Sequence, residues 1–193
     1  MNEKKNKKNN LPLIIVLIFA AIIIVVVSVV AYLRLTAGTY KNENLKFSFS
    51  IPSGWKIATQ KIKEEMDVPD AEALLIKEDA KKTIVVNVEG GAPEEKKVTE
   101  DYLMIEAEGT SKVFSSFIRE FKVVKALPLE SRNDGIEVIF TGLDNNNETI
   151  KINVISIYHN KSKYVFFLKS YPEDFEKDNI SFLKIINSLR FLD

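Results

Sequence analysis

Hydrophobic and polar residues alternate strictly over Leu45–Ile51, and this period of two predicts a strand with one buried face. The apolar residues that share this face are Leu45, Phe47, Phe49 and Ile51. Ser48 and Ser50 fall on the opposite face. Pro52-Ser-Gly54 then predicts a turn, and we expect the following Trp55 to close a corner of the core.

Six further segments have the composition of strands, and short polar turns separate most of them. We expect these strands at Ala73–Lys77, Thr83–Val88, Lys122–Leu129, Ile136–Thr141, Thr149–His159 and Lys163–Ser170. The last contains Tyr164–Leu168, which is apolar on both faces. Such a run is typical of a central strand that is covered by helices on each side.

Helical periodicity occurs in two places. The first helix is expected to begin at Val98, with Thr99 as N-cap, and to reach Ile118 either as one kinked helix or as two. The second follows the capping-box sequence Ser170-Tyr-Pro-Glu173, and its apolar residues recur at helical spacing towards Leu189. Together these elements predict an α+β fold in which a mostly antiparallel sheet lies between helices.

The segment Leu11–Leu33 carries no charged residue. Its 23 residues would extend about 35 Å as a helix, enough to cross a hydrocarbon core of about 30 Å. A cleaved signal peptide is the alternative, and Val29-Val30-Ala31 could serve as its cleavage site. Because the apolar run is longer than the core of an ordinary signal peptide, we favour an uncleaved signal anchor that contacts the lipid bilayer.

Charge predicts the orientation of this anchor. Four lysines between Lys4 and Lys8 precede the span, whereas only Arg34 directly follows it. Positive charge stays in the cytoplasm, so we expect a cytoplasmic N-terminus and an extracytoplasmic C-terminal domain. The expected organisation is a basic tail over residues 1–10, a transmembrane signal anchor over 11–33, a tether over 34–44 and one α/β domain over 45–193.

Composition excludes several classes of site. The chain has no cysteine, which excludes disulfides, thiol nucleophiles, cysteine-ligated metals and a lipoprotein anchor. Its single histidine excludes a site with several histidine ligands. The 27 basic and 27 acidic side chains give no net charge, which argues against a partner that is a nucleic acid.

Four features have the residue types of a functional site, but each also has a simpler interpretation. His159 ends a strand and is expected to be a solvated turn residue, since no Gly-x-Ser-x-Gly motif accompanies it. Asp144–Glu148 offers oxygen ligands for calcium, yet it lacks the EF-hand pattern and is better explained as a hairpin turn. The acidic cluster formed by Glu64, Glu65, Asp67, Asp70 and Glu72 is expected to be a solvated surface, and Trp55 to be a core residue. We therefore assign no catalytic, cofactor-binding or metal-binding residue.

The segment Tyr40–Trp55 resembles the opening of PsbP-like domains: an aromatic residue, a short turn, a phenylalanine-rich strand and a Pro-x-Gly-Trp corner follow one another. The ending Ile186-Asn-Ser-Leu-Arg-Phe191 resembles theirs less specifically. The resemblance implies an antiparallel sheet between helices. It implies no activity, because the functions of the family are scattered and it has no catalytic motif that could be mapped onto this chain.

Two functions remain open. We expect a membrane-anchored extracytoplasmic module that is not an enzyme, needs no cofactor and binds a protein or cell-wall component of the envelope. The alternative is an envelope-associated hydrolase or metal-dependent enzyme of unrecognised type. A cluster of His159 with two carboxylates in a cleft would favour the alternative.

Overall fold

The structure is a computed structural model that describes residues 38–77, 82–92, 100–116 and 118–192. The predicted basic tail and signal anchor, residues 1–33, lie outside these ranges. No helix in the described ranges is both long enough and apolar enough to cross a membrane. Residues from Thr39 onward form one compact unit.

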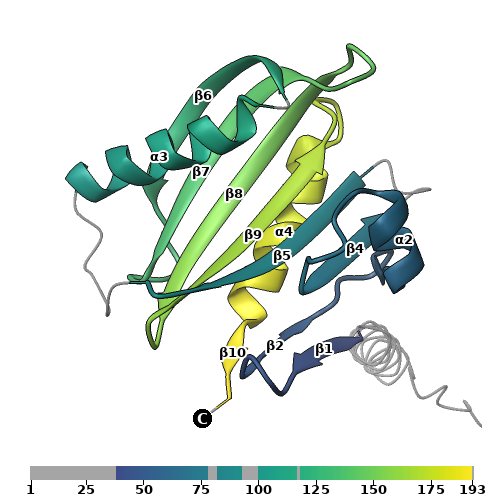
Figure 1. Ribbon diagram of the computed structural model, residues 1–193, viewed down its shortest axis with the longest axis vertical. Coiled ribbons are helices and arrows are strands. Elements are labelled where there is room, and N and C mark those ends of the chain that lie inside the picture. The colour runs from purple at the N-terminus through teal and green to yellow at the C-terminus, as the bar shows by residue number, and fades with distance from the viewer. Residues whose placement is uncertain (1–37, 78–81, 93–99, 117, 193) are drawn as a thin grey trace, which may run out of the picture. The chain divides into compact units, whose positions relative to one another are not determined.

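A seven-stranded antiparallel sheet forms the centre of this unit (Figure 1). Its strands, in spatial order, are β3 (Lys56–Ile57), β4 (Ala73–Lys77), β5 (Lys82–Gly90), β9 (Ser162–Ser170), β8 (Thr149–His159), β7 (Gly135–Leu143) and β6 (Arg119–Pro128). β9 occupies the fourth position, between β5 and β8. The prediction that the doubly apolar segment Tyr164–Leu168 is a central strand is therefore confirmed.

A second, three-stranded sheet brings the two ends of the unit together. β2 (Phe47–Ser50) lies between β1 (Thr39–Asn42) and β10 (Arg190–Phe191). The predicted tether over 34–44 is thus wrong for its described part, most of which is strand β1. Tyr40 explains the difference, because its ring stacks on Phe49 at 5.0 Å and its hydroxyl donates to the Glu72 carbonyl at 2.8 Å.

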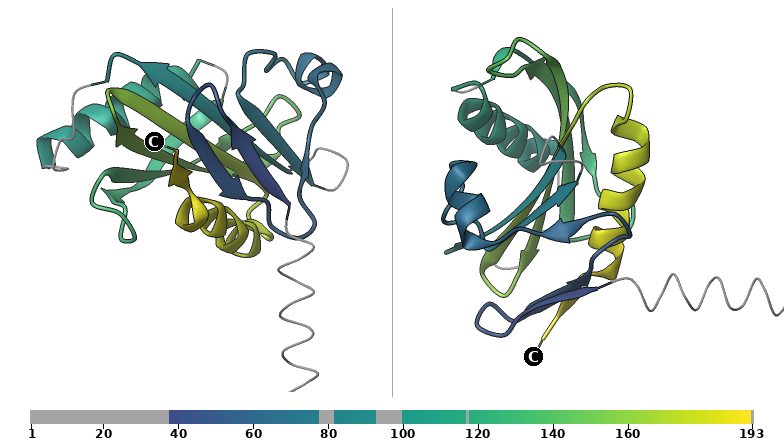
Figure 2. Two further views of the ribbon diagram at one scale, coloured as in Figure 1. Left: turned by 90° about the horizontal axis from the view of Figure 1, so that it is seen from below. Right: turned by 90° about the vertical axis from the view of Figure 1, so that its right-hand side faces the viewer.

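Helices cover both faces of the large sheet, as predicted (Figure 2). α2 (Gln60–Glu65) and α3 (Glu100–Phe114) lie on one face, and α4 (Phe175–Ser188) lies on the other. α3 is a single helix that continues through Gly109 and ends at Phe114, four residues before the predicted end at Ile118. The predicted N-cap Thr99 lies outside the described residues.

The start of α4 differs from the prediction. Ser170 still belongs to β9, and its hydroxyl donates to the carboxylate of Asp178 at 2.7 Å instead of capping the helix. The helix begins at Phe175 with Asp174 as N-cap. The sequence Ser170–Glu173 therefore forms the strand end and a turn, and the hydrogen bond of Ser170 ties β9 to the helix interior.

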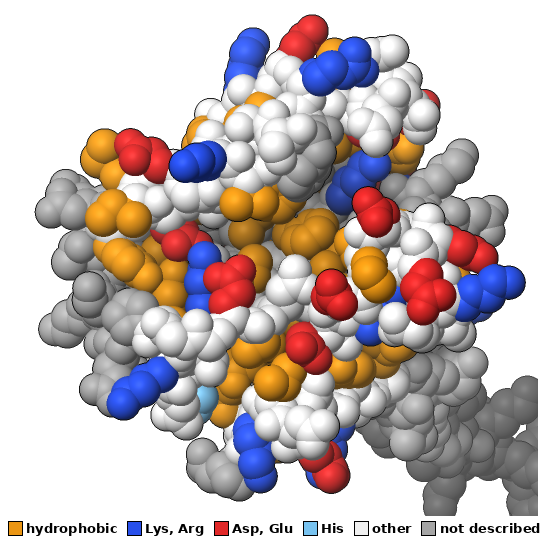
Figure 3. All heavy atoms as spheres, in the orientation of Figure 1, with side chains coloured by type: hydrophobic (Ala, Val, Ile, Leu, Met, Phe, Trp, Pro, Cys, Tyr) orange, Lys and Arg blue, Asp and Glu red, His pale blue; other side chains and the backbone are white. Residues whose placement is uncertain are grey.

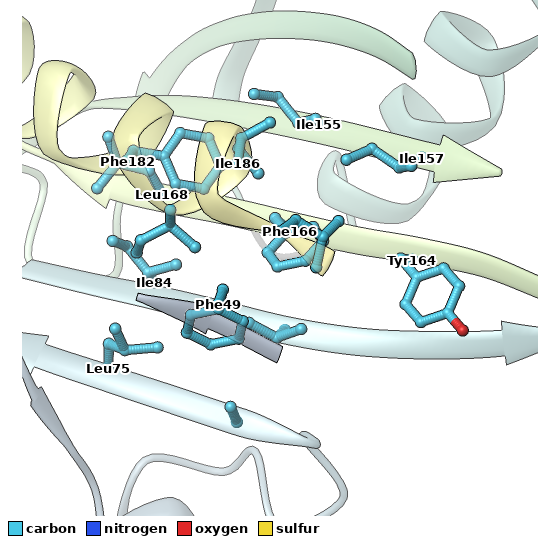
Figure 4. Close-up of a cluster of buried hydrophobic side chains, with 14 of the residues drawn as sticks. Phe49, Leu75, Ile84, Ile155, Ile157, Tyr164, Phe166, Leu168, Phe182 and Ile186 are labelled. Carbon is cyan, nitrogen blue, oxygen red and sulfur yellow. The ribbon is translucent and has the colours of Figure 1, made fainter. Parts of the chain in front are cut away.

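The main hydrophobic core fills the space between the large sheet, α4 and the small sheet (Figure 4). Phe47, Phe49 and Trp55 are buried in it, as predicted. Phe166 and Phe182 meet them from β9 and α4, and both are fully buried. A second core lies on the other face of the sheet, beneath α3, and a smaller one lies beneath α2.

Candidate functional site

A hollowed groove crosses the face of the large sheet between α3 and the loop that follows α2 (Figure 3). It consists of two adjoining hollows of about 430 and 390 Å³ that share Phe167 of β9. We call it the α2–α3 groove. Phe167 is only half-buried, and its ring meets that of Phe114 edge to face at 5.6 Å. Phe167 thus gives the groove an aromatic floor at the point where the cores beneath α2 and α3 meet.

One end of the groove is acidic. Asp67, Asp70 and Glu72, which follow α2, lie around this hollow together with Glu89 at the end of β5. Its floor includes Val85, Asn87 and Phe167, whereas Val88, the next residue of β5, packs on the main core on the other face. In Figure 3 red carboxylates border the orange floor on the side of α2. We call this end the acidic hollow.

The opposite end is formed by the turn between β7 and β8. Asp144 organises this turn, because its carboxylate accepts from the backbone N–H groups of Asn146 at 2.9 Å and Glu148 at 3.1 Å. Its other oxygen lies 3.2 Å from the ammonium of Lys169. Burial raises the pKa of Asp144, but the two backbone hydrogen bonds and Lys169 together hold this pKa below its ordinary value. Asp144 is thus a charged structural residue of the turn.

A buried carboxylate holds α3 against the sheet and so fixes one wall of the groove. Glu106 accepts from the hydroxyls of Ser156 at 2.7 Å and Tyr158 at 3.0 Å, both on β8. The ammonium of Lys163 lies 2.6 Å from the same carboxylate. Burial, together with the neighbouring Tyr102 and Glu106, raises the pKa of Tyr158 far above its ordinary value. Tyr158 consequently stays protonated and serves as a permanent donor to Glu106.

His159 lies elsewhere, beside the small sheet. Its ring is half-buried and stacks on Phe191 of β10, with the ring centroids 3.8 Å apart and the planes 6° from parallel. His159 thus ends β8 beside the turn at Asn160, as predicted, but its ring packs on Phe191 instead of being free in solvent. Among the described residues that line the adjoining hollow, none is an aspartate or glutamate. The arrangement of His159 with two carboxylates that would indicate an enzyme is not formed there.

The structure also locates the other features that were singled out in the sequence. Asp144–Glu148 is a hairpin turn, as expected. In the described part of the chain no three histidine, aspartate or glutamate residues gather closely enough to hold a metal ion. Trp55 is a core residue, and the ammonium of Lys77 lies 5.7 Å from the centre of its ring. Of the acidic cluster, Asp67, Asp70 and Glu72 line one hollow of the groove, and the turn at Asp144 lines the other.

Sequence reasoning missed Phe167 and Glu106. The doubly apolar segment Tyr164–Leu168 predicts a strand with both faces covered, and it does not reveal that the layer over Phe167 is incomplete. Glu106 did carry a signal: it lies between Leu103 and Ala107 on the apolar face of the predicted helix. A carboxylate on such a face indicates a buried polar partner.

Neither a family model nor a curated protein matches this sequence. Solved structures do have a similar fold. Cyanobacterial PsbP (CyanoP) from Synechocystis sp. PCC 6803 is 13% identical, with a TM-score of 0.55 over 80% of this chain and 91% of CyanoP. A protein from Bacteroides thetaiotaomicron is 10% identical, with a TM-score of 0.50 over 81% of this chain and 49% of that one.

LpqN from Mycobacterium tuberculosis, which is involved in cell envelope biogenesis, gives a TM-score of 0.48 at 12% identity over 82% of this chain and 86% of LpqN. At such identities structural likeness concerns the fold and not the activity. The order of elements and the superposition on CyanoP agree with the resemblance of Tyr40–Trp55 to PsbP-like domains. The unit that begins at Thr39 has the PsbP-like fold.

Proposed function

We propose that this chain is a single-pass membrane protein whose extracytoplasmic domain is a non-enzymatic binding or scaffold module. Its partner would be a protein or a cell-wall component of the envelope, and the partner would engage the α2–α3 groove. The uncharged span Leu11–Leu33 and the lysines before it support the anchor and its orientation.

The observation that carries this proposal is the half-buried aromatic side chain of Phe167 on the floor of the groove. A hollow that combines apolar lining with polar borders is the usual form of a binding site, whereas Tyr164, Phe166 and Leu168 on the opposite face of β9 are buried in the main core. The groove also has rigid walls. Glu106 ties α3 to β8, and Asp144 fixes the β7–β8 turn, so little ordering would be required when a partner binds.

The surroundings of the candidate catalytic groups also favour a binding module over a hydrolase. Glu106 and Asp144 are both engaged by lysines and hydrogen-bond donors that belong to the fold. His159 packs on Phe191, and no described carboxylate borders its hollow. A general acid–base pair needs two such groups directed at one substrate position.

Site-specific photocrosslinking in the native cell tests this function. A photoreactive residue at Asn87 or Asn146 would place the crosslinker in one or the other hollow of the groove. The matched control is Ile180, which is exposed on α4, on the opposite face of the sheet. We expect both groove positions to capture the same envelope partner and Ile180 to capture none. Capture from Ile180 alone, or from no position, would contradict the proposal.

A further inference from the structure

The acidic hollow has an excess of negative charge. Four acidic residues line it, Asp67, Asp70, Glu72 and Glu89, and the Glu72 carboxylate also accepts from the side-chain amide of Asn42 at 3.3 Å. Two lysines lie nearby and offset part of this charge: Lys63 donates to the Ala71 carbonyl at 2.6 Å, and Lys163 lies 2.6 Å from Glu106 and 3.9 Å from Glu89. Within the described part of the chain, the carboxylates of Asp67 and Asp70 have no ion pair or hydrogen bond to a side chain.

The same hollow also has apolar lining, from Val68, Pro69 and Phe167. Carboxylates beside apolar surface favour a ligand that is both cationic and apolar. A simple cation would meet the carboxylates but would leave the apolar surface of Val68, Pro69 and Phe167 uncovered. A lysine or arginine side chain fits both, because its aliphatic stem packs on apolar surface while its charged head reaches the carboxylates. An aromatic ring on the floor adds to the attraction of a cationic head.

From this complementarity we propose that the acidic hollow binds a lysine or arginine side chain presented by an apolar peptide segment of a protein partner. The apolar neighbours of that side chain would cover Phe167 and continue into the second hollow beside Phe114. The proposal rests on the proposed function of the groove and adds the chemistry of the partner. It makes the partner a protein with a basic and apolar segment, not a glycan and not a metal ion.

Binding of model peptides to the full chain in zwitterionic lipid nanodiscs tests this chemistry. The probe is a labelled octapeptide in which leucine and lysine alternate, and empty nanodiscs give the background. Two matched peptides replace lysine by glutamate or leucine by serine. We expect fluorescence anisotropy to show at least tenfold tighter binding of the leucine–lysine peptide than of either matched peptide, with weaker binding at high salt.

The variant that tests the acidic hollow is Asp67→Asn combined with Asp70→Asn. Asparagine is suited to the left-handed backbone of Asp67, whose φ is 57°, so the loop should keep its shape. The matched control is Glu130→Gln combined with Glu176→Gln, which removes two carboxylates beside α4 on the other face. We expect the first variant to weaken binding of the leucine–lysine peptide at least tenfold and the second to leave it unchanged.

Three results would overturn the assignment. The glutamate peptide could bind as tightly, the control variant could weaken binding equally, or millimolar calcium alone could displace the peptide at constant ionic strength. Phe167→Ala distinguishes the proposals. If it weakens binding of all three peptides while Asp67→Asn with Asp70→Asn has no effect, the groove binds peptides but the basic partner is wrong. The groove itself would be rejected if neither Phe167→Ala nor Asp67→Asn with Asp70→Asn weakened peptide binding and if Asn87 and Asn146 gave no crosslinks.

Discussion

Phe49 of β2 and Phe166 of β9 meet edge to face in the main core, with their ring centroids 6.1 Å apart and their planes at 76°. The contact joins the small sheet to the centre of the large sheet (Figure 4). Both side chains are buried, and Phe49 also stacks on Tyr40 of β1. The two sheets therefore share one core and should unfold together.

Replacement of Phe49 by alanine tests this coupling. The lost ring would leave a cavity between the sheets, and such a change costs about 3–5 kcal/mol of the free energy of unfolding. Thermal and urea unfolding of the fragment 39–193 should show a single, lowered transition. Ser50→Ala is the control, because this side chain is exposed and its loss should cost less than about 0.5 kcal/mol. Equal sensitivity of the two positions would show that the strand register is wrong.

Glu106→Ala should loosen α3. The substitution leaves Ser156, Tyr158 and Lys163 without their common acceptor. We expect a loss of about 2–3 kcal/mol, less than for a fully buried pair because Lys163 retains contact with water. Hydrogen exchange should become faster in α3 and stay unchanged in α4. Glu108→Ala, exposed on the same helix, is the control. Unchanged exchange in α3 would mean that apolar packing alone holds it.

Asp144→Asn should change how stability depends on pH. The pKa of Asp144 is lower in the folded than in the unfolded state, so its contribution to stability is complete above the unfolded pKa of about 4. That contribution is lost as the pH falls through the folded pKa. The variant should therefore be less stable by about 1 kcal/mol at pH 7 and indistinguishable from the natural protein at the acid end. Urea midpoints measured from pH 7 to pH 2 check this, and a constant difference across that range would contradict it.

His159→Ala should cost about 0.5–1.5 kcal/mol, since it removes a ring stacked on Phe191. His159→Phe restores an aromatic ring and should recover most of that loss. Partner capture by the α2–α3 groove should be the same in both variants. Thermal unfolding and crosslinking yield check the two statements. Loss of a function in both variants, with the fold intact, would make His159 a residue of a functional site.

The orientation of the chain can be tested with intact protoplasts. A protease added from outside should digest the domain over 45–193 and leave the N-terminal tail, because four lysines precede the span Leu11–Leu33. Immunoblotting with separate tags at the two ends detects both products. Protection of the domain would contradict the orientation. Release of an intact soluble protein that begins near Tyr32 would show a cleaved signal peptide instead.

The elements that could be predicted are those with a strong local pattern. β8 matches its predicted bounds because Thr149–His159 is long, apolar and rich in branched residues. β10 could not be predicted, since two residues carry no pattern and Arg190 and Phe191 form a strand only because β2 lies beside them. The start of α4 was misjudged because the partner of Ser170 is Asp178, which the capping pattern does not reveal.

The groove was beyond local sequence reasoning for a similar reason. The acidic residues after α2 could be recognised as a cluster, and Phe167 as part of a strand. Nothing in either segment indicates that β5 and β9 pair and bring them to one hollow. Contacts between residues that are distant in sequence depend on the whole topology, whereas turns, caps and strands depend on neighbours.

The pairing of β2 with β10 also constrains how the chain can fold as it emerges. β2 is made near the beginning of the domain and β10 long after it, so the three-stranded sheet cannot close until Arg190 and Phe191 have been made. Until then the backbone groups along the edge of β2 at Phe47 and Ser48 have no strand to pair with. The growing domain must therefore avoid premature association along this edge of β2 until Arg190 and Phe191 dock there.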